Sequence, residues 1–597
     1  MTSKKMKTDY AQLFTATDIM DIDVHPNGRV ALCSVNDGVN WGIARLNLSS
    51  GHISVILRGD RSKSLMRPSY SPSGTRLAYQ KDFEGNENHD VFVANADGSR
   101  PKRLTDSVED NFEPHFSPDE TMIAFLSNRK DDVENLYTID ADGGKIRRLT
   151  NEPLPIREFY WSQDSRKIVY ASGVGDDDYI SLLNVRKASS KKILSKKNVE
   201  HWLAGEYGGA SPWSSDGTSF LFRSNDHDVM NILQFNIARS KAKMLVKSKN
   251  EKYQPQWSCD GRSLAYLEVD DPNLLLKVKR GNQTKTGSPG EGVSRAARWL
   301  PNGDLVFING SSVRPDEVYV TKGASPRKMT RLQKKPIDKR LLSIPRLISF
   351  ESIDGVEIWA QLFVPRNRSR KAGIVLPHGG PDAQDLDAWD QLTPMFVDKG
   401  FAVIKPNYRG STGYGRKFNH LHDRDLGGGD FMDTVYAGKY LIDSGLVAED
   451  RLGYWGASYS GFTCMLALSK TPEMWAAGVS IVGFFDWETE MATERGYLKA
   501  YDQQKMGIYE ENPEFFKDRS PIYFLENIKA PLLMTASSRD VRCPPTESRA
   551  VVKKLKELGK DVIYHEYPDE GHWPRKRKNL KDLYERSVEF LDSKIPK

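Results

Sequence analysis

A short polar turn that recurs through the first half of the chain constrains the possible fold more than any other feature of this sequence. Its copies lie at residues 25–28, 71–74, 117–120, 162–165, 214–217, 258–261 and 301–303. The last residues of successive turns are 46, 46, 45, 52, 44 and 42 positions apart, and strands of alternating pattern follow several of them. A repeat of this length indicates a β-propeller, in which each blade is a four-stranded sheet.

The repeats also contain a hairpin with a tight Asp-Gly turn, at residues 90–99 and in parallel form at residues 135–144. Period-two alternation around such a turn is the pattern of an antiparallel hairpin. Seven units of four strands predict a seven-bladed β-propeller over residues 21–335. Tryptophans recur in the repeats, and we expect them to fill equivalent packing sites between blades: Trp161, Trp213, Trp257 and Trp299.

At 597 residues the chain is too long for a single hydrophobic core, so a second large domain is expected. The boundary is predicted at residues 336–345, a basic stretch between two prolines, and residues 346–597 are predicted to form an α/β-hydrolase domain. Residues 1–20 precede the first repeat as an N-terminal extension. Within it, residues 11–20 could form a helix that packs back on the hydrolase domain.

The second half of the chain contains a serine on a turn between a strand and a helix. Apolar residues lead into Gly456-Ala457-Ser458-Tyr459-Ser460-Gly461, and an apolar helix follows. This is the layout of a nucleophile elbow, which holds a serine hydroxyl exposed on a sharp turn. The usual pattern is Gly-x-Ser-x-Gly, and Ser460 stands at the last glycine. Because serine is also small, we interpret the change as a tolerated variation.

Two further residues follow in the order that an α/β-hydrolase requires. Asp540 comes just after a short apolar strand at residues 531–536, and His572 comes just after a strand at residues 561–567. Loops at the carboxyl ends of parallel strands are where such sheets collect their functional groups. A serine needs a base to take its proton, and an aspartate holds the imidazole in the right tautomer. The sequence therefore predicts a Ser458, Asp540, His572 triad.

An oxyanion hole is predicted from the first parallel strand of the domain. Residues 372–376 form an apolar strand that ends in Pro377-His378-Gly379-Gly380-Pro381. A His-Gly-Gly turn at this place offers a backbone N–H to the developing negative charge. We predict that Gly380 supplies one donor, with Gly379 as the alternative, and that Tyr459 supplies the other. His378 is expected to brace the loop.

Several motifs together resemble the prolyl oligopeptidase family of serine peptidases, with the acylaminoacyl peptidases as the closest branch. They are His378-Gly379-Gly380-Pro381, the segment Asn-Tyr-Arg-Gly-Ser-Thr-Gly-Tyr-Gly at residues 407–415, Gly427-Gly428-Gly429-Asp430 with Asp433, and the three triad loops. The resemblance covers about the last 250 residues. It implies the same triad and oxyanion hole, and a propeller that lies over the active-site face and admits short peptides.

The resemblance also suggests a substrate-binding residue. The family's Asp-x-Arg-x-Pro loop matches Asp540, Arg542 and Pro544, which implies that Arg542 helps to hold the substrate backbone. Departures are Ser460 and the segment Thr-Ala-Ser at residues 535–537, where many relatives have His-Gly. We expect these two departures to affect the rate and the fine specificity more than the class of reaction.

An apolar specificity pocket is a further candidate. Phe484, Phe485 and Trp487 follow an apolar strand at residues 479–482, near the predicted position of the nucleophile. They are candidates for a pocket that takes the side chain before the scissile bond. The alternative is that these three residues belong to the hydrolase core.

Composition excludes several other classes of function. The net charge is +6, with 86 basic and 80 acidic residues spread along the chain, which is not the footprint of a nucleic-acid-binding protein. The 4 cysteines are widely spaced and show no metal or redox pattern, and no run of 18 apolar residues occurs. We expect no cofactor, no metal and no membrane partner, and a cytoplasmic protein. A homo-oligomer is possible.

The sequence therefore predicts a serine peptidase that hydrolyses short peptides by acyl transfer, releasing N-acylated amino acids from peptide N-termini. Alternatives that use the same chemistry are a dipeptidyl peptidase, an endo-acting oligopeptidase and a carboxylesterase. An alternative from another class is a binding protein whose propeller recruits partners while the hydrolase half is inactive.

Overall fold

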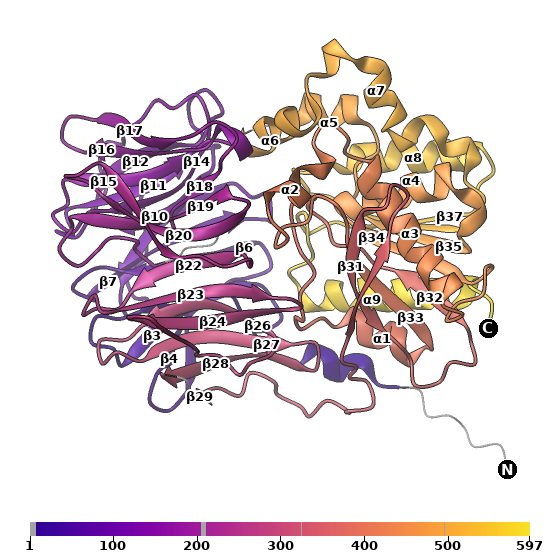
Figure 1. Ribbon diagram of the computed structural model, residues 1–597, viewed down its shortest axis with the longest axis horizontal. Helices are drawn as coiled ribbons and strands as arrows, with labels where there is room; N and C mark the ends of the chain where they lie inside the picture. The colour runs from indigo at the N-terminus through magenta and orange to yellow at the C-terminus, as the bar shows by residue number, and fades with distance from the viewer. Residues whose placement is uncertain (1–7, 205–209, 324, 495) are drawn as a thin grey trace.

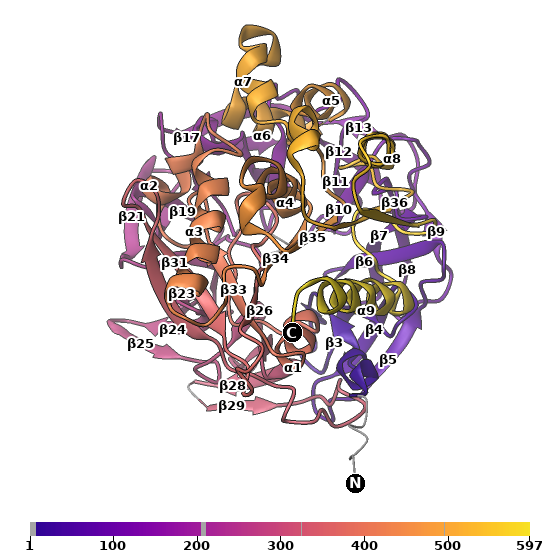
Figure 2. The same cartoon turned by 90° about the vertical axis from the view of Figure 1, so that its right-hand side faces the viewer.

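The protein consists of a β-rich N-terminal part and an α/β C-terminal part that lie side by side (Figure 1). This computed structural model describes residues 8–204, 210–323, 325–494 and 496–597. The N-terminal part is propeller-like, and the C-terminal part has the architecture of an α/β-hydrolase, as the sequence predicts. In Figure 2 the hydrolase faces the viewer, and the ring of β-sheets lies behind it.

The N-terminal part is built from antiparallel sheets that follow one another along the chain. The first sheet contains β1 (Asp18–Ile19), β2 (Asp23–Val24), β3 (Val30–Asn36), β4 (Trp41–Asn47) and β5 (Ile53–Leu57). Four-stranded sheets follow: β6 (Lys63–Tyr70), β7 (Arg76–Phe83), β8 (His89–Asn95) and β9 (Lys102–Arg103); β10 (Asn111–Phe116), β11 (Met122–Ser127), β12 (Asn135–Asp140) and β13 (Arg147–Arg148); and β14 (Ile156–Trp161), β15 (Lys167–Ser172), β16 (Tyr179–Asn184) and β17 (Ser189–Ser195).

The next four-stranded sheet contains β18 (His201–Trp202), β19 (Ser219–His227), β20 (Val229–Asn236) and β21 (Lys241–Val246). The last N-terminal strands are β22 (Lys252–Trp257), β23 (Ser263–Asp270), β24 (Asn273–Arg280), β25 (Gln283–Thr286), β26 (Val293–Trp299), β27 (Leu305–Ser311), β28 (Arg314–Lys322) and β29 (Ser325–Lys328). They form one hydrogen-bonded sheet, in which a single parallel pair, Leu274 with Val293, links β22–β25 to β26–β29.

The repeated turns make repeated hydrogen bonds. In four of them the serine hydroxyl donates to the aspartate two residues later at 2.6 Å: Ser117 to Asp119, Ser162 to Asp164, Ser214 to Asp216 and Ser258 to Asp260. Three of the four predicted tryptophans are equivalent in the same way, whereas the buried indole N–H of Trp257 has no hydrogen-bond partner among the described residues. The indoles of Trp161, Trp213 and Trp299 donate to backbone oxygens of His115, Tyr160 and Gln256, each on the first strand of the preceding four-stranded unit. The sequence repeat is thus a repeat of packing.

The N-terminal segment contacts both parts of the molecule. A 3₁₀ helix spans Tyr10–Phe14, the Tyr10 hydroxyl donates to Asp398 at 2.8 Å, and the side chains of Leu13 and Phe14 belong to a hydrolase core cluster. The N–H of Thr17 then donates to the carbonyl of Leu332 at 3.0 Å, which joins the first sheet to the end of the last one. The helix considered for residues 11–20 is therefore wrong in extent, because the chain turns into β1 at Asp18.

The hydrolase is an eight-stranded sheet in the order β30-β31-β33-β32-β34-β35-β36-β37. Its strands are β30 (Arg346–Glu351), β31 (Glu357–Phe363), β32 (Ala372–Val375), β33 (Phe401–Asn407), β34 (Leu452–Ala457), β35 (Ala477–Ile481), β36 (Leu532–Ser537) and β37 (Val562–Tyr567). β32 to β37 pair in parallel, so the loops at their carboxyl ends meet at one edge of the sheet. That edge faces the propeller.

Helices cover the sheet and project from its edge. They are α1 (Leu392–Asp398), α2 (Arg416–Asn419), α3 (Gly429–Asp443), α4 (Tyr459–Lys470), α5 (Trp487–Thr493), α6 (Gly496–Met506), α7 (Pro513–Asp518), α8 (Pro545–Glu557) and α9 (Arg577–Lys594). α5 to α7 lie between β35 and β36 in the chain, and α6 reaches the propeller (Figure 1). Within the described ranges, no helix is both long enough and apolar enough to cross a membrane.

Candidate active site

Ser458 lies on a strained turn between β34 and α4. Its backbone has φ 57° and ψ −126°, a region that a serine rarely occupies. The neighbouring glycines allow the turn. A Cβ on Gly456 would lie 1.9 Å from the carbonyl oxygen of Ser460, and one on Gly461 would lie 2.8 Å from that of Ile481. The strand and the helix therefore approach too closely for any side chain at these two positions.

Ser460, which stands where the usual elbow has a glycine, closes the turn through its hydroxyl. Its Oγ accepts from the N–H of Ala457 at 2.8 Å and lies 2.9 Å from the carbonyl oxygen of the same residue, to which it donates. The side chain is buried. The departure from the usual pattern thus adds local hydrogen bonds, which fits its interpretation as a tolerated variation.

Ser458, His572 and Asp540 form a continuous chain of hydrogen bonds. The Nε2 atom of His572 lies 3.0 Å from Oγ of Ser458, and Nδ1 lies 2.8 and 3.0 Å from the two carboxylate oxygens of Asp540. Asp540 also accepts the backbone N–H groups of Arg542 and Cys543 at 2.9 and 3.0 Å. Three loops separated by up to 114 residues in the chain thus meet at the sheet edge.

The hydrogen bonds of Asp540 assign the tautomer of His572. An ionised carboxylate can only accept, so Nδ1 of the ring is the donor in this pair. Nε2 is then left as an acceptor that faces the hydroxyl of Ser458. This arrangement can remove a proton from the serine and stabilise the imidazolium that forms.

The loop predicted to supply the oxyanion hole packs directly against the elbow. A Cβ on Gly379 would lie 3.0 Å from the carbonyl oxygen of Ala457 and 3.4 Å from Cβ of Ser458. Gly380 has φ 136°, a backbone conformation that favours glycine. His378 braces this loop, because its Nε2 lies 2.9 Å from the hydroxyl of Ser411 and its Nδ1 lies 2.7 Å from the carbonyl of Gly379.

Tyr459, the residue after the serine, is fixed by a buried acid. Its hydroxyl donates to Asp430 and accepts the N–H of Gly427 at 3.0 Å. Burial raises the pKa of Asp430 to about 6, with hydrogen bonds opposing the shift. Tyr459 is the first residue of α4, so its backbone N–H has no acceptor within that helix. It is free to face the same space as the Gly379–Gly380 loop.

The hairpin of β7 and β8 in the propeller contacts the loops that carry Asp540 and His572. Asp82 and Arg575 form an ion pair at 2.5 Å, and Glu87 and Arg542 form another at 2.8 Å. The backbones also touch: a Cβ on Gly571 would lie 2.0 Å from the carbonyl oxygen of Gly85. Arg542, predicted to bind the substrate backbone, thus lines the cavity while it is paired with an acid of the propeller.

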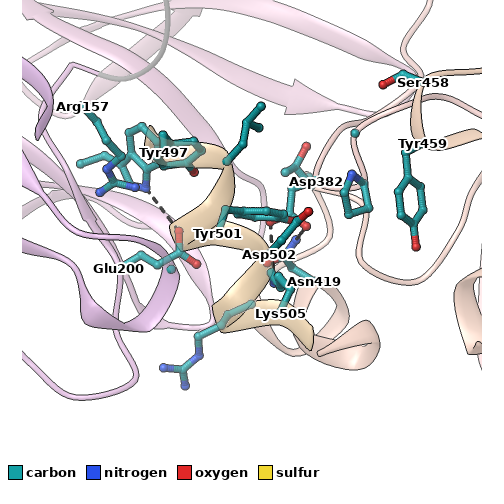
Figure 3. A pocket seen from close by; sticks show the side chains of 18 of the residues that line it. Arg157, Glu200, Asp382, Asn419, Ser458, Tyr459, Tyr497, Tyr501, Asp502 and Lys505 are labelled. Atoms are coloured by element: carbon teal, nitrogen blue, oxygen red, sulfur yellow. Dashed lines mark hydrogen bonds and ion pairs between the residues drawn. The ribbon is translucent and has the colours of Figure 1, made fainter. Parts of the chain in front are cut away.

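Ser458 opens into a cavity of about 320 Å³ between the two parts of the molecule. This is the size of a small-ligand site. Figure 3 shows Ser458 and Tyr459 on one side of it and Arg157 and Glu200, from the propeller, on the other. The cavity is also lined by Gly380, Phe484, Trp487 and Arg542. Three acids line it as well: Glu490 of α5, Glu494 at the C-terminal end of α5, and Asp502 of α6.

Two of the three predicted pocket aromatics face this cavity. Phe484 and Trp487 pack edge to face with ring centroids 4.7 Å apart, and Phe484 stacks on Phe462 at 4.5 Å. The prediction for Phe485 is wrong. It does not line the cavity, it is fully buried in the hydrolase core, and its N–H donates to Glu547 at 2.9 Å. The two neighbouring rings thus have different surroundings, the cavity for Phe484 and the core for Phe485.

Sequence reasoning missed the acids of the cavity. Glu490 and Glu494 follow Trp487 at helical spacing, and that spacing was the signal that could have placed them on the same face. Glu200 gave no such signal, because it precedes a two-residue strand far from the hydrolase in sequence. Among the residues that the structure describes, no group of three His, Cys, Asp or Glu side chains is arranged to hold a metal ion.

Comparison with known proteins identifies both parts of the chain. Residues 389–597 match the prolyl oligopeptidase family, and residues 42–202 match the TolB β-propeller domain. Dipeptidyl aminopeptidase BIII of Pseudoxanthomonas mexicana is 29% identical over 258 residues, covering 41% of this chain and 37% of that protein. The acylamino-acid-releasing enzyme of Rattus norvegicus is 26% identical over 235 residues, covering 38% of this chain and 32% of that protein.

Solved structures share the whole fold at low identity. A puromycin-hydrolysing peptidase of Mycobacterium tuberculosis superimposes with a TM-score of 0.85 at 18% identity, covering 98% of this chain and 96% of that one. The curated relatives, in contrast, are matched over only about a third of their length, 37% and 32%. The family match at residues 389–597 contains Ser458, Asp540 and His572.

Proposed function

We propose that this chain, whose residues 389–597 match the prolyl oligopeptidase family of serine peptidases, hydrolyses short peptides by acyl transfer with Ser458 as the nucleophile. The observation that carries the proposal is the hydrogen-bonded chain Ser458–His572–Asp540, with contacts of 3.0 and 2.8 Å. These are the distances at which a general base can take the proton of an attacking hydroxyl.

In the proposed reaction His572 removes the proton from Ser458 as Oγ attacks the peptide carbonyl. The N–H groups of Tyr459 and of Gly380, or Gly379, donate to the oxyanion of the tetrahedral intermediate. His572 then gives its proton to the leaving amine. Water repeats the sequence on the acyl-enzyme, with His572 again as the base, and the free acid is released.

We also propose that the propeller is seven-bladed, spans residues 21–335, and restricts the enzyme to short peptides. This count is supported by four separate four-stranded units: β6–β9, β10–β13, β14–β17 and β18–β21. Two joined blades, β22–β25 and β26–β29, and the blade nearest the N-terminus, β2–β5, bring the number to seven. The cavity that contains Ser458 is lined from both parts of the molecule, so a folded protein chain could not reach it without separating them.

Among the specificities that the sequence leaves open, the cavity favours release of a dipeptide with a free amino terminus. Glu200 lines the propeller side, and its side chain is 17% exposed. Burial alone would raise its pKa, but hydrogen bonds with His420 and Trp202 and the charge of Arg157 outweigh burial and lower the pKa below its usual value. An ionised carboxylate at this place would pair with an α-ammonium group.

Release of N-acylated amino acids is the second candidate. It is supported by the apolar side chains of Met230 and Tyr253, which line the same side of the cavity and could pack against an uncharged acyl group. The two candidates differ in what the propeller side binds: a cation beside Glu200, or an acyl group beside these side chains.

A fluorophosphonate probe followed by a substrate pair tests the proposal. Wild type should be labelled and Ser458→Ala should not, and equal labelling of the two would show that the nucleophile is wrong. Glycyl-norleucyl and acetyl-norleucyl coumarin amides then separate the specificities. Wild type should prefer the free amine, and Glu200→Gln should lower that preference by about 10- to 100-fold, the usual effect of losing a hydrogen bond to a charged group. A preference for the acetylated substrate would favour the second candidate.

A further inference from the structure

The hydrolase side of the cavity carries a cluster of three carboxyl groups that the proposed reaction does not use. Glu490 belongs to α5, Glu494 caps its C-terminal end, and Asp502 belongs to α6. All three line the cavity that contains Ser458. Glu490 and Asp502 are 4% and 8% exposed, which is unusual for acidic side chains.

Among the residues that the structure describes, the three carboxyl groups form no ion pair with a lysine or arginine, although the charge of Lys499 acts on Glu494 and lowers its pKa. Oε2 of Glu490 and Oε2 of Glu494 are buried and accept no hydrogen bond from an N–H or hydroxyl donor, and the carboxyl groups instead share hydrogen bonds between Glu494 and its neighbours Glu490 and Asp502. Lys505, a basic residue of the same lining, is paired with other acids: it lies 2.6 Å from Asp423 and 3.7 Å from Asp382. Figure 3 shows Lys505 one turn beyond Asp502 on the helix that crosses the cavity.

Burial makes the charged form of this cluster costly. It raises the pKa of Glu494 to about 7, and it raises those of Glu490 and Asp502 well above their usual values, with repulsion from neighbouring carboxylates adding to the shift of the latter two. Glu490 and Glu494 are also four residues apart along one helical face, where like charges are destabilising. A bound cation would remove both penalties, because it would replace a shared proton with an opposite charge.

Aromatic rings separate the cluster from the nucleophile. Phe484 lies 6.4 Å from Tyr459, the neighbour of Ser458, and 4.7 Å from Trp487, measured between ring centroids. Trp487 is three residues before Glu490 on the same helix. A side chain that enters beside Ser458 would therefore meet an apolar wall first and acids beyond it. A long aliphatic stem with a cationic end fits this order, and the rings can also attract the cation.

We infer that this end of the cavity is a specificity site for a lysine or arginine side chain on the substrate residue whose carbonyl Ser458 attacks. The inference rests on the proposed function, since it assigns a side chain to the same acyl-transfer site. A metal ion is the other cation that a carboxyl cluster could take, but no group of three ligands in the described residues is arranged to hold one.

A matched pair of substrates measures this preference directly. Lysine and norleucine have side chains with equally long aliphatic stems, and only lysine carries a charge. Coumarin amides of glycyl-lysine and glycyl-norleucine, and of acetyl-lysine and acetyl-norleucine, give the lysine-to-norleucine ratio of kcat/KM whichever amino-terminal group the enzyme accepts. We expect a ratio of about 10 or more in the wild type, and a fall of about 10- to 100-fold in Glu490→Gln.

Glu547→Gln is the matched control variant. Glu547 is also a buried acid of this region, and burial raises its pKa to about 8, but it contacts the backbone of Phe485 and does not line the cavity. Its ratio should stay within about twofold of wild type, because a substrate side chain does not reach it. An equal fall in both variants would overturn the inference, since it would show a general effect of removing acids.

A wild-type ratio near or below one, in enzyme that the fluorophosphonate labels, would also overturn the inference and leave the proposed reaction intact. A wild type that is not labelled would instead contradict the proposed function. The wild-type ratio needs no variant, so the test holds even if Glu490→Gln does not fold. We expect that variant to fold with an equal or higher melting temperature, because it removes a buried acid without a counter-ion.

Discussion

The nucleophile and its base are positioned by different parts of the molecule. Ser458 is held by the backbone of β34 and α4, with Gly456, Ser460 and Gly461 shaping the turn, and its N–H donates to the carbonyl of Ile481 at 2.9 Å, so these contacts all lie within the hydrolase. The loop of His572 instead touches the propeller, through Gly85 against Gly571 and through the ion pair of Asp82 with Arg575. The hydrolase can place its serine alone, while its base also depends on the propeller.

This contrast suggests how the two parts cooperate. The β7–β8 hairpin contacts the Asp540 loop through Glu87 and Arg542, and the His572 loop through Asp82, near the end of β7, and Arg575. Both ion pairs cross between parts of the chain more than 450 residues apart. A movement of the propeller away from the hydrolase would therefore disturb the two triad members that activate the serine, and it would leave the elbow as it is.

Removal of the base should have the largest effect. His572→Ala should lower kcat by about 10⁴- to 10⁶-fold, as deletion of a triad member does, because Ser458 then has no acceptor for its proton. Activity on a coumarin amide substrate measures this, and circular dichroism should show an unchanged fold. Activity within tenfold of wild type would mean that another group serves as the base.

Displacement of the base without removing it should have the next largest effect. Gly571→Ala places a Cβ about 2 Å from the carbonyl oxygen of Gly85, so the loop must shift, and a misplacement of about 1 Å can cost about 100-fold in rate. We expect kcat/KM to fall by about that factor. Gly287→Ala is the control, because a Cβ there meets only ordinary contacts of 3.4 Å or more. Equal activity of the two variants would show that the hairpin does not position His572.

Loss of an ion pair between the two parts should have a moderate effect on stability. In Asp82→Asn the guanidinium of Arg575 loses its partner carboxylate, whose own side chain is fully buried. Breaking a buried pair costs about 3 kcal/mol. Chemical denaturation should show this loss, and kcat should fall together with it. If Asp82→Asn and Arg575→Gln were additive in the double variant, the two residues would not act as a pair.

The smallest effect is expected at the elbow itself. Ser460→Gly restores the usual pattern and removes the two hydrogen bonds of the Ser460 side chain to Ala457. We expect a loss of about 1 kcal/mol in unfolding free energy and a change in kcat of about threefold or less, because the backbone still fixes Ser458. A loss of activity as large as that of Gly571→Ala would contradict the distinction between the locally held serine and the externally held base.

Most of the fold could be predicted because its signals are local or periodic. The turn repeat predicted the propeller-like sheets, and Gly456-Ala457-Ser458 predicted the strand–turn–helix that the structure has. The N-terminal segment was less predictable. Leu13 and Phe14 pack on the hydrolase as expected, but the helix stops at Phe14 because the following residues pair as a strand with β3.

The site was predictable only in part. Residue type and order identified Ser458, Asp540 and His572, and the structure brings them together. Phe484 and Phe485 looked equivalent in sequence, yet only Phe484 faces the cavity. The direction of a side chain in an irregular segment depends on what packs around it. Here Glu547, an acid of α8, accepts a hydrogen bond from the N–H of Phe485.

The sequence by itself determined the acyl-transfer chemistry, because the nucleophile elbow and the strand-end loops are short stretches of chain whose geometry is set by local sterics. Only the tertiary structure decided what surrounds that chemistry. The acids of α5 and α6, Glu200 of the propeller and the β7–β8 hairpin loop come from distant segments. Their meeting depends on how two domains pack, which no local pattern encodes.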